Sequence, residues 1–585
     1  MDKKWAQSLL SREQHILFPV TLDDIVPANH AIRILDAILD TCDWNQWEIH
    51  YNGHRGQPPI HPRLMAGCIL YGLLRSIRSS RGLEDATRER KDFMWFLEGR
   101  VIDHSTFASF RTAFSKELKD LHRQIARKIC ELTQAAFDEL VLDGTRERAN
   151  SDRHGARSAQ TIEQMIKSIV ATLDGKLDEM ARADQASCPA PGRQIDAFDQ
   201  EPAAPEQTDM PRQLLAAAPQ TDCAKTAGEM ARLQHEIEQL RAKAKQLQKA
   251  LDAARERDEI KKKIAGKNAK ATRVPLTDPD SYIQPNKDGG YAPNYTPAVA
   301  VNGANGAIMH ADVVPGAEEG VIALPAVEEA KAITGAAPQR ILADGNVLTG
   351  KTMQDLEREG IAMYTPTGTD FSDSNPANRP DPSEPVPESQ RAKLPHRAEL
   401  FSQAAFVYDA ENDRYYCPWG KVLEPVGNAT QIGSRGCRQK YICPGKEGCP
   451  FANECVPEKT PVRSVVRDEY QDTRDEIGRC MATPEGRAVY KRRAPVVEVV
   501  FARIKQQMGI RQFLLRGLDK VRTEWSWICA AYNLKLLMGL VSGGAKSPGK
   551  DEERLRKSRF PRENPVLVVQ FGGGRHCEWA LHRAA

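Results

Sequence analysis

Two short apolar segments end in an Asp-Gly pair, and this feature most restricts how the chain can fold. The segment LVLDGT contains Asp143, and the segment RILADGN contains Asp344. Both read as buried strands, and the glycine after each aspartate leaves space above the strand end. An aspartate in this position is usually a turn former or a helix cap. Two of them in the same context favour a functional role over this ordinary one, although they do not decide it.

Residues 1–135 are predicted to form an all-helical domain. Apolar residues recur there with helical periodicity, and several arginines follow them. One helix is expected to open at residues 104–106, with Ser105 or Thr106 as its cap. Short helices with exposed arginines fit a DNA-binding domain. The pattern fits a helical packing domain with solvated charges equally well.

Two helical patterns flank a spacer rich in proline and acidic residues at about 185–222. The second pattern is a heptad seam of about four repeats, in which apolar residues alternate at steps of three and four. The seam consists of Met230, Leu233, Ile237, Leu240, Ala244, Leu247, Leu251 and Ala254. We interpret residues 160–272 as a helical hairpin inserted after the strand that ends at Asp143. An intermolecular coiled coil is the alternative.

From about residue 295 the pattern becomes β-α. Residues 296–301 and 307–314 alternate around a glycine-containing turn, as a β-hairpin does. The whole chain is expected to be a multidomain α/β protein. Its predicted parts are the helical domain (1–135), the first part of a core (136–159), the inserted hairpin (160–272), the rest of the core (273–366), a Pro-, Ser- and Asp-rich linker (367–399), a Cys-rich insert (400–480), further core helices (481–545) and a C-terminal tail (546–585).

The net charge of +3 is too small to indicate nucleic-acid binding by itself. With 41% hydrophobic and 28% charged residues, the composition is that of a soluble globular protein. The N-terminus lacks the apolar segment of a signal peptide, and the longest apolar stretch, residues 528–541, is too short to span a bilayer. We therefore expect a cytoplasmic protein without a membrane partner.

Positive charge is concentrated in one C-terminal stretch that includes YKRRAPVVEVVFARIKQQMGIRQFLLRGLDKVRTEW. Between Arg487 and Arg522, ten Lys and Arg residues accompany two acids, Glu498 and Asp519. On a helix, the apolar residues of 497–504 form a face that packs on a sheet, and Glu498 lies at its edge. A salt bridge explains a lone acid beside basic residues. A surface that binds a polyanion around a metal-binding acid also needs basic residues next to that acid, and this stretch supplies both.

Phosphodiester cleavage needs cations that activate the attacking oxygen and stabilise the leaving one, and these hard cations need clustered carboxylates. Two aspartates at the ends of adjacent strands and a third acid on a neighbouring helix can supply them. Asp143, Asp344 and Glu498 follow one another in this order along the chain. They are therefore the candidate catalytic and metal-binding residues.

The order of elements and several local strings resemble the bacterial insertion-sequence DDE transposases, which have an RNase H-like catalytic core. VLDGTRERAN and LADGN resemble the two aspartate motifs, and VVEVVFARIK with the later FLLRGL resembles the glutamate helix. HPRLMAGCILYGLLRSIRSSRGLE and DHSTFASFR resemble the family's N-terminal helical DNA-binding domain. The resemblance implies that Asp143, Asp344 and Glu498 bind two Mg²⁺ ions, for which Mn²⁺ can substitute.

The resemblance also implies residues that contact DNA. Tyr490, Arg493 and Lys505 are nearest to the tyrosine, arginine and lysine of the family signature. The spacing from Tyr490 to Arg493 and from Glu498 to Lys505 agrees with that signature, whereas Arg493 lies one residue too far from Glu498. Nearby arginines, among them Arg511 and Arg516, are expected to hold phosphates as well. The resemblance thus implies that the basic stretch between Arg487 and Arg522 is a DNA-binding surface.

Five cysteines fall between positions 417 and 455, near Pro and Gly residues. Tight turns of this kind present thiolates to a structural zinc ion, although the spacing is looser than in a CxxC knuckle. A few buried thiols are the alternative. The family resemblance maps the zinc ligands to Cys417, Cys443, Cys449 and Cys455 and leaves Cys437 over. Zinc would stabilise an insert too small to build a core of its own.

Together these features imply a nucleoid-associated DNA transposase with endonuclease and strand-transfer activity at the terminal inverted repeats of its element. The expected mechanism is two-metal, in-line transesterification. Its partners would be double-stranded end and target DNA and at least a second copy of the chain, because the two ends are paired. Two alternatives stay open. A transposase-derived protein could bind DNA without cutting it, and a nuclease with the same core could cut without joining strands.

Overall fold

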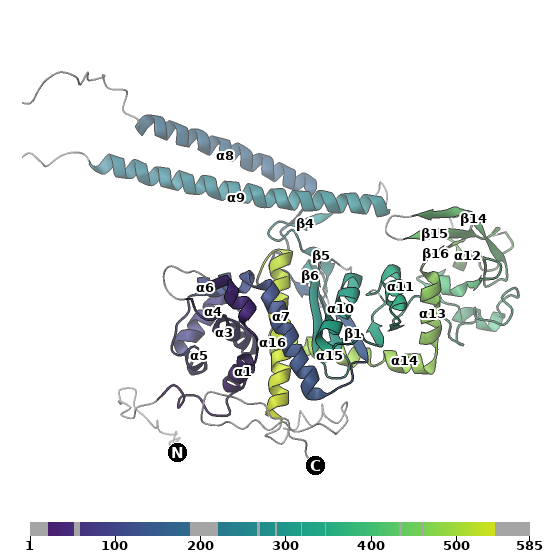
Figure 1. Cartoon of the computed structure of the whole chain (residues 1–585). Helices are drawn as coiled ribbons and strands as arrows, with labels where there is room; N and C mark the ends of the chain where they lie inside the picture. The colour runs from purple at the N-terminus through teal and green to yellow at the C-terminus, as the bar shows by residue number, and fades with distance from the viewer. Residues whose placement is uncertain are drawn as a thin grey trace, which may run out of the picture. The chain divides into compact units, whose positions relative to one another are not determined.

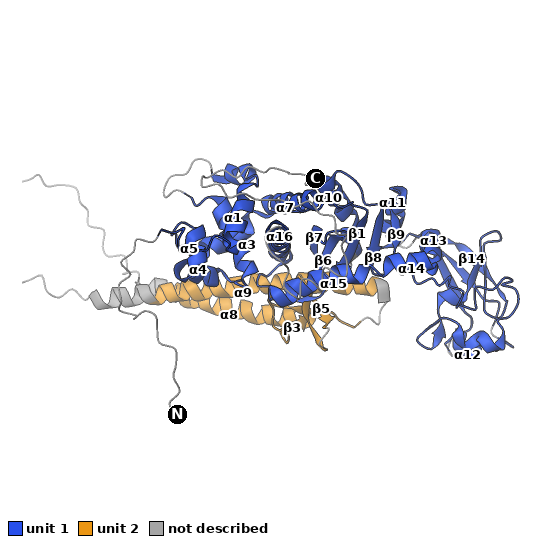
Figure 2. Cartoon of the chain, turned by 90° about the horizontal axis from the view of Figure 1, so that it is seen from below, with its two compact units in different colours: residues 1–147, 295–585 blue, residues 148–294 orange. Residues whose placement is uncertain are grey.

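The computed structural model describes residues 21–51, 59–187, 220–265, 270–286, 289–316, 319–345, 347–431, 436–445, 447–457 and 460–543. The chain divides into two compact units, residues 1–147 with 295–585 and residues 148–294 (Figure 2). Most of the predicted spacer and the tail predicted at 546–585 lie outside the described residues. Within the described ranges, no helix is long and apolar enough to cross a membrane.

Unit 1 begins with helices, as predicted for residues 1–135 (Figure 1). They are α1 (Ala31–Asp40), α2 (Asn45–Glu48), the 3₁₀ turn Ile49–Tyr51, α3 (Pro62–Leu74), α4 (Ser80–Glu89), α5 (Lys91–Phe96), α6 (His104–Ala113) and α7 (Ser115–Thr133). The predicted cap of α6 is wrong. Asp103 is the N-cap, and its carboxylate accepts from the backbone N–H of Ser105 at 2.7 Å. Ser105 and Thr106 lie inside the first turn, and the aspartate before them accepts from one of the free N–H groups of that turn.

A mixed β-sheet forms the centre of unit 1, and its strand order is β7-β6-β1-β8-β9. The strands are β1 (Glu139–Gly144), β6 (Tyr291–Asn302), β7 (Ile308–Val314), β8 (Arg340–Ala343) and β9 (Ala362–Tyr364). β6 runs antiparallel to β1 and β7, whereas β1, β8 and β9 are parallel. The predicted hairpin and strands are confirmed, and this sheet is consistent with an RNase H-like core.

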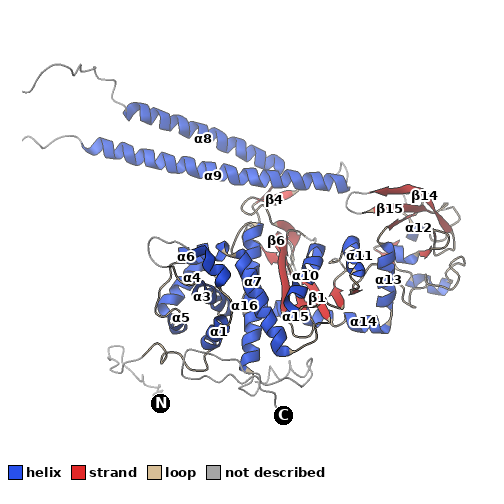
Figure 3. Ribbon diagram, viewed as in Figure 1, coloured by secondary structure: helices blue, strands red, loops and turns tan. Residues whose placement is uncertain are grey.

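Helices pack against this sheet (Figure 3). They are α10 (Ala323–Thr334), preceded by the 3₁₀ turn Glu319–Ile322, α11 (Gly350–Arg358), α13 (Gln471–Ala482), α14 (Pro484–Tyr490), α15 (Arg493–Ala502) and α16 (Leu518–Ser542). A π-helical turn (Arg503–Gln507) follows α15. α15 packs on β1 through the fully buried Val497 and Val500, in agreement with the predicted apolar face. α16 packs on both β7 and α7, so the N-terminal helices and the sheet share one core.

Asn533 of α16 connects β7 and α7 inside this core. Its side chain accepts from the backbone N–H of Ile308 at 2.9 Å and donates to the Ile308 carbonyl at 2.8 Å. Its amide nitrogen also contacts Nε2 of His122 at 3.1 Å. Both side chains are buried, so these bonds satisfy polar groups that water does not reach. Burial lowers the pKa of His122 to about 4, and the ring is therefore neutral at pH 7.

The buried His122 predicts that the protein loses stability at acidic pH. In the unfolded chain His122 takes up a proton near pH 6.5, whereas in the folded protein it does so only near pH 4. The stability contributed by the neutral ring is complete above pH 6.5 and is lost as the pH falls to about 4, on the order of 3 kcal/mol in total. Thermal unfolding at pH 7 and pH 5 measures this loss. His122→Gln retains an acceptor for Asn533 and should lose less, and an equal loss in both proteins would contradict the prediction.

The Cys-rich region of unit 1 contains a separate five-stranded antiparallel sheet with the order β12-β13-β14-β15-β16. Its elements are the 3₁₀ turn Glu388–Lys393, β10 (His396–Arg397), β11 (Leu400–Phe401), the 3₁₀ turn Gln403–Ala405, β12 (Val407–Asp409), β13 (Arg414–Tyr416), β14 (Val422–Gln431), β15 (Cys437–Ile442), α12 (Ala452–Cys455) and β16 (Ser464–Asp468). Buried residues such as Tyr415 and Tyr441 form a hydrophobic core. The expectation that this region is too small to build a core is therefore wrong.

The linker predicted at 367–399 is also wrong, because these residues belong to the Cys-rich region. Ala377 and Val386 are fully buried in its hydrophobic core. The backbone N–H of Val386 donates to the carbonyl of Pro418 at 2.8 Å, and the side chain of Asn375 donates to two backbone carbonyls. The backbone of this segment is irregular, as its proline content indicates. Its hydrogen bonds and its few apolar side chains nevertheless attach it to the Cys-rich region.

Unit 2 is built around the helical hairpin that the sequence predicts. α8 (Ala159–Ser187) and α9 (Gln220–Ala265) are antiparallel, because Glu163 pairs with Arg255 at 2.7 Å and Glu236 with Lys176 at 3.0 Å. Leu247 and other seam residues pack against α8 of the same chain. The short elements of this unit are β3 (Ala156–Ser158), which pairs with β4 (Arg273–Pro275), and β5 (Tyr282–Pro285), which pairs with residues 291–294 of β6. The chain enters unit 2 through β2 (Glu147–Arg148).

Candidate active site

The parallel pairing of β1 and β8 brings Asp143 and Asp344 to the same edge of the sheet. Leu142 is paired with Ala343, and each aspartate is the next residue of its strand segment. Each carboxylate also accepts from the backbone N–H of the glycine that follows it, at 2.9 Å for Asp143 and 2.8 Å for Asp344. The two Asp-Gly segments therefore place Asp143 and Asp344 at neighbouring strand ends.

The electrostatics of this edge suit a cation. Burial raises the pKa of Asp143, and the negative charge of Asp344 raises it further. The positive charge of Arg493 acts in the opposite direction. Asp344 is exposed, so the pair is open to solvent on one side. Two neighbouring carboxylates with oxygen atoms accessible from outside are a donor set that fits Mg²⁺.

The start of α15 is attached to β1 by two adjacent arginines. Arg493 pairs with Asp143 at 3.2 Å, near the end of the strand. Arg492 pairs with Glu139 at the beginning of the same strand. The guanidinium of Arg493 also lies 5.8 Å from the centre of the Tyr490 ring. Arg493 therefore has a defined contact with a candidate metal ligand, which the sequence motif alone did not indicate.

Glu498 lies in the middle of α15 and is exposed, whereas its neighbour Val497 is fully buried. α15 packs on β1, so the helix that carries Glu498 contacts the strand that carries Asp143. The oxygen atoms of Asp143, Asp344 and Glu498 do not all lie within 4.8 Å of one another in the described part of the chain. The structure thus pairs the two aspartates and places Glu498 on an adjacent element.

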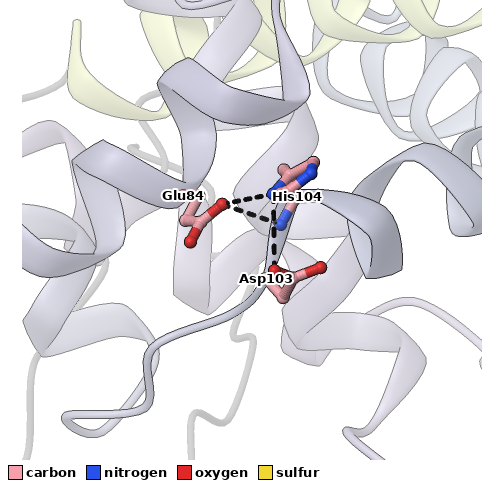
Figure 4. A group of neighbouring side chains, drawn as sticks. All are labelled: Glu84, Asp103 and His104. Carbon is pink, nitrogen blue, oxygen red and sulfur yellow. Dashed lines mark hydrogen bonds and ion pairs between the residues drawn. The ribbon is translucent and has the colours of Figure 1, made fainter. Parts of the chain in front are cut away.

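One other group of side chains does bring three potential ligand atoms within 4.8 Å, among the residues that the structure describes. It consists of Glu84, Asp103 and His104 (Figure 4). Glu84 accepts from both the backbone N–H of His104, at 3.1 Å, and its ring Nδ1, at 2.7 Å, and it also pairs with Arg88 at 2.5 Å. Asp103 caps α6. These contacts explain the group as the N-terminal capping of α6, without a metal.

The predicted DNA-binding residues lie around α15. Lys505 is in the π-helical turn and contacts the segment after β1. Arg511 donates to the side chain of Gln506 at 2.9 Å. Arg511 and Arg516 are both exposed, and they lie in the segment between the π-helical turn and α16. Tyr490 is the last residue of α14.

Cys417, Cys443, Cys449 and Cys455 line one pocket of the Cys-rich region, together with aromatic side chains. Cys437 does not line this pocket and begins β15. Burial raises the pKa of Cys417, and it raises that of Cys455 to about 12. Within the described ranges, no three of these sulfur atoms lie within 4.8 Å of one another. Burial thus favours the neutral thiol form of Cys417 and Cys455, and the four cysteines around this pocket are of the residue type that structural zinc takes as ligands once they are deprotonated.

Two buried acids, Glu139 and Glu147, are not among the candidate residues that the sequence indicated. Glu139 is 7% exposed and pairs with Arg340 and Arg492. Glu147 is 4% exposed and pairs with Lys505. Each is an ordinary acid next to an apolar strand in the sequence, and only the position of its distant partner gives it a role. For Glu147, the alternate spacing of Asp143, Thr145 and Glu147 was the one local feature of the sequence that could have indicated a role.

Two family models match the chain. Residues 416–538, which include Glu498, match the model described as a transposase DDE domain. Residues 20–113 match the model described as a transposase domain (DUF772). No curated protein and no solved structure gives a significant match. Two segments of the chain are therefore similar to transposase domains, and domains of this kind imply DNA transposition.

Proposed function

We propose that this protein is a bacterial insertion-sequence transposase, which cuts DNA at the terminal inverted repeats of its element and joins the ends to target DNA. The observation that carries the proposal is the placement of Asp143 beside Asp344 at one edge of the sheet, in a chain with transposase domains. Glu498 completes the proposed catalytic set from the helix that packs on β1.

In the proposed reaction, Asp143, Asp344 and Glu498 hold two Mg²⁺ ions, for which Mn²⁺ can substitute. When bound, these ions supply activation of the attacking hydroxyl and stabilisation of the leaving oxygen. The register between β1 and β8 aligns the two aspartates. Arg493 offsets part of the charge of Asp143 through its 3.2 Å ion pair, which reduces the repulsion between the two carboxylates.

The basic residues around α15 are proposed to hold the DNA backbone. Tyr490, Arg493, Lys505, Arg511 and Arg516 lie on or beside the element that carries Glu498. Contacts of this type position DNA without reading its sequence. The helical region 1–135 is proposed to recognise the inverted repeat. Because two ends must be paired, we propose that a dimer or a larger assembly is the active form.

We propose that the Cys-rich region, together with residues 367–399 that pack against it, is a zinc-containing module inserted before the glutamate helix. Its ligands would be Cys417, Cys443, Cys449 and Cys455, and the shared pocket supports this set. The hairpin of unit 2 is likewise proposed as an insert in the catalytic core, since the chain leaves the core after β1 and returns in β6.

Cleavage and joining assays test the proposal and separate its alternatives. DNA that flanks the gene supplies the end sequences, and the purified protein with Mg²⁺ should cut at those ends. Pre-cleaved ends should then join to a second DNA molecule. Binding without cutting would instead support a transposase-derived DNA-binding protein. Cutting without joining would support a nuclease with the same core.

A further inference from the structure

Glu147 is a buried acid near the candidate site to which the proposed reaction assigns no role. It follows Asp143 closely on the segment that leaves the same strand end, and it is only 4% exposed. Burial raises the pKa of its carboxyl group, whereas the positive charges of Lys505, Arg78 and Arg511 lower it. An acid with this environment is costly to bury unless a cation pairs with it.

Lys505 provides that pair and also contacts Thr145. Its Nζ lies 2.6 Å from Oε1 of Glu147 and donates to Oγ1 of Thr145 at 2.6 Å. Thr145 and Glu147 are buried, whereas the side chain of Lys505 keeps 24% of its surface exposed. An ammonium group has three donors, and these two contacts direct two of them into the protein. The third donor is left for a ligand, and the partly exposed side chain gives that ligand a way to approach.

The backbone that carries Lys505 is also unusual. Residues 503–507 form a π-helical turn directly after α15. Such a turn inserts an extra residue into a helix and changes the direction of the side chains that follow, and it occurs frequently at functional sites. Ile504 is buried and anchors the turn in the core. Lys505 is therefore held from two sides, by its backbone and by Thr145 and Glu147.

We propose that Glu147 and Thr145 are positioning residues, which hold the ammonium group of Lys505 beside the strand end of Asp143 so that it binds a phosphate of the DNA. This inference rests on the proposed function and adds to it two residues that act through Lys505. Glu147 has a further effect that a neutral residue lacks, because its negative charge attracts the ammonium group of Lys505 across the 2.6 Å contact.

A double-mutant cycle tests the proposal on the full-length protein. Glu147→Gln keeps the size of the side chain and removes its charge. It should lower the single-turnover cleavage rate roughly 10- to 100-fold, because a displacement of about 1 Å at a positioning group has an effect of that size. In a Lys505→Ala background the same substitution should have little further effect, since the coupled partner is absent. Lys505→Ala by itself should reduce the slope of log Kd against log salt by about 0.9, as for one phosphate contact.

Glu329→Gln is the matched control, because it removes the charge from another partly buried acid, which pairs with Arg123 at 2.8 Å in a different part of unit 1. It should leave the cleavage rate unchanged. Thr145→Val is a second variant in case Glu147→Gln does not fold, and its loss should depend on Lys505 in the same way. Equal losses with and without Lys505, or an unchanged salt slope, overturn the inference. A wild-type protein that does not cut overturns the proposed function itself.

Discussion

Asp143→Asn is expected to lower Mg²⁺-dependent cleavage by at least about 10³-fold, while binding of end DNA changes little. Asparagine keeps the size of the side chain and an oxygen that can accept from the Gly144 backbone N–H, so the strand end should keep its shape. It lacks the negative charge that a divalent cation requires. Asp344→Asn should have the same effect, because the two carboxylates share one edge of the sheet. Single-turnover cleavage and a gel-shift assay measure the two quantities separately.

Asp138→Asn is the control for this prediction, because Asp138 precedes the other end of β1. Its backbone carbonyl accepts from Gln339 and Arg340, so the strand pairing does not depend on the carboxylate. This variant should cut like the wild type. Cleavage retained by Asp143→Asn would remove the strand-end carboxylates from the mechanism. If only Glu498→Gln retained cleavage, only the glutamate would be removed from the proposed catalytic set. The structure places Glu498 on a neighbouring helix, whereas the two aspartates lie at paired strand ends.

Substitution of the pocket cysteines is expected to have the second large effect. The wild-type protein should contain close to one zinc ion per chain, and Cys417→Ser or Cys455→Ser should contain close to none, because serine does not supply a thiolate. The variants should also unfold at a lower temperature, since metal binding contributes to folding. Elemental analysis and thermal unfolding of the full chain measure these changes.

Cys437→Ser is the matched control, because Cys437 lies in the same region but does not line the pocket. It should keep its zinc and its unfolding temperature. A wild-type protein without zinc, prepared in the absence of chelators, would contradict the prediction and favour cysteines that are only free thiols. The zinc-free variants should also cut DNA less well. Arg467 of β16 pairs with Asp475 of α13 at 3.1 Å, and α13 leads to the helices that carry Glu498.

Much of the local structure could be predicted because its causes are local. The alternation of apolar residues around 302–306 predicted a hairpin, and the heptad seam predicted a long helix with one buried face. Composition was a poorer guide to packing. Residues 367–399 are rich in Pro, Ser and Asp, yet Ala377 and Val386 are fully buried. A few apolar side chains and backbone hydrogen bonds are enough to attach such a segment to a sheet.

The sequence by itself determined the two strand-end aspartates, the basic stretch around Glu498 and the clustering of the cysteines, because residue type and spacing are visible along the chain. Only the tertiary structure decided which of these side chains meet. The parallel register of β1 and β8 joined Asp143 to Asp344, and packing of α15 brought Arg493 to the first of them. The pair of Lys505 with the buried Glu147 was equally invisible, because burial and ion pairing depend on contacts between residues far apart in the chain.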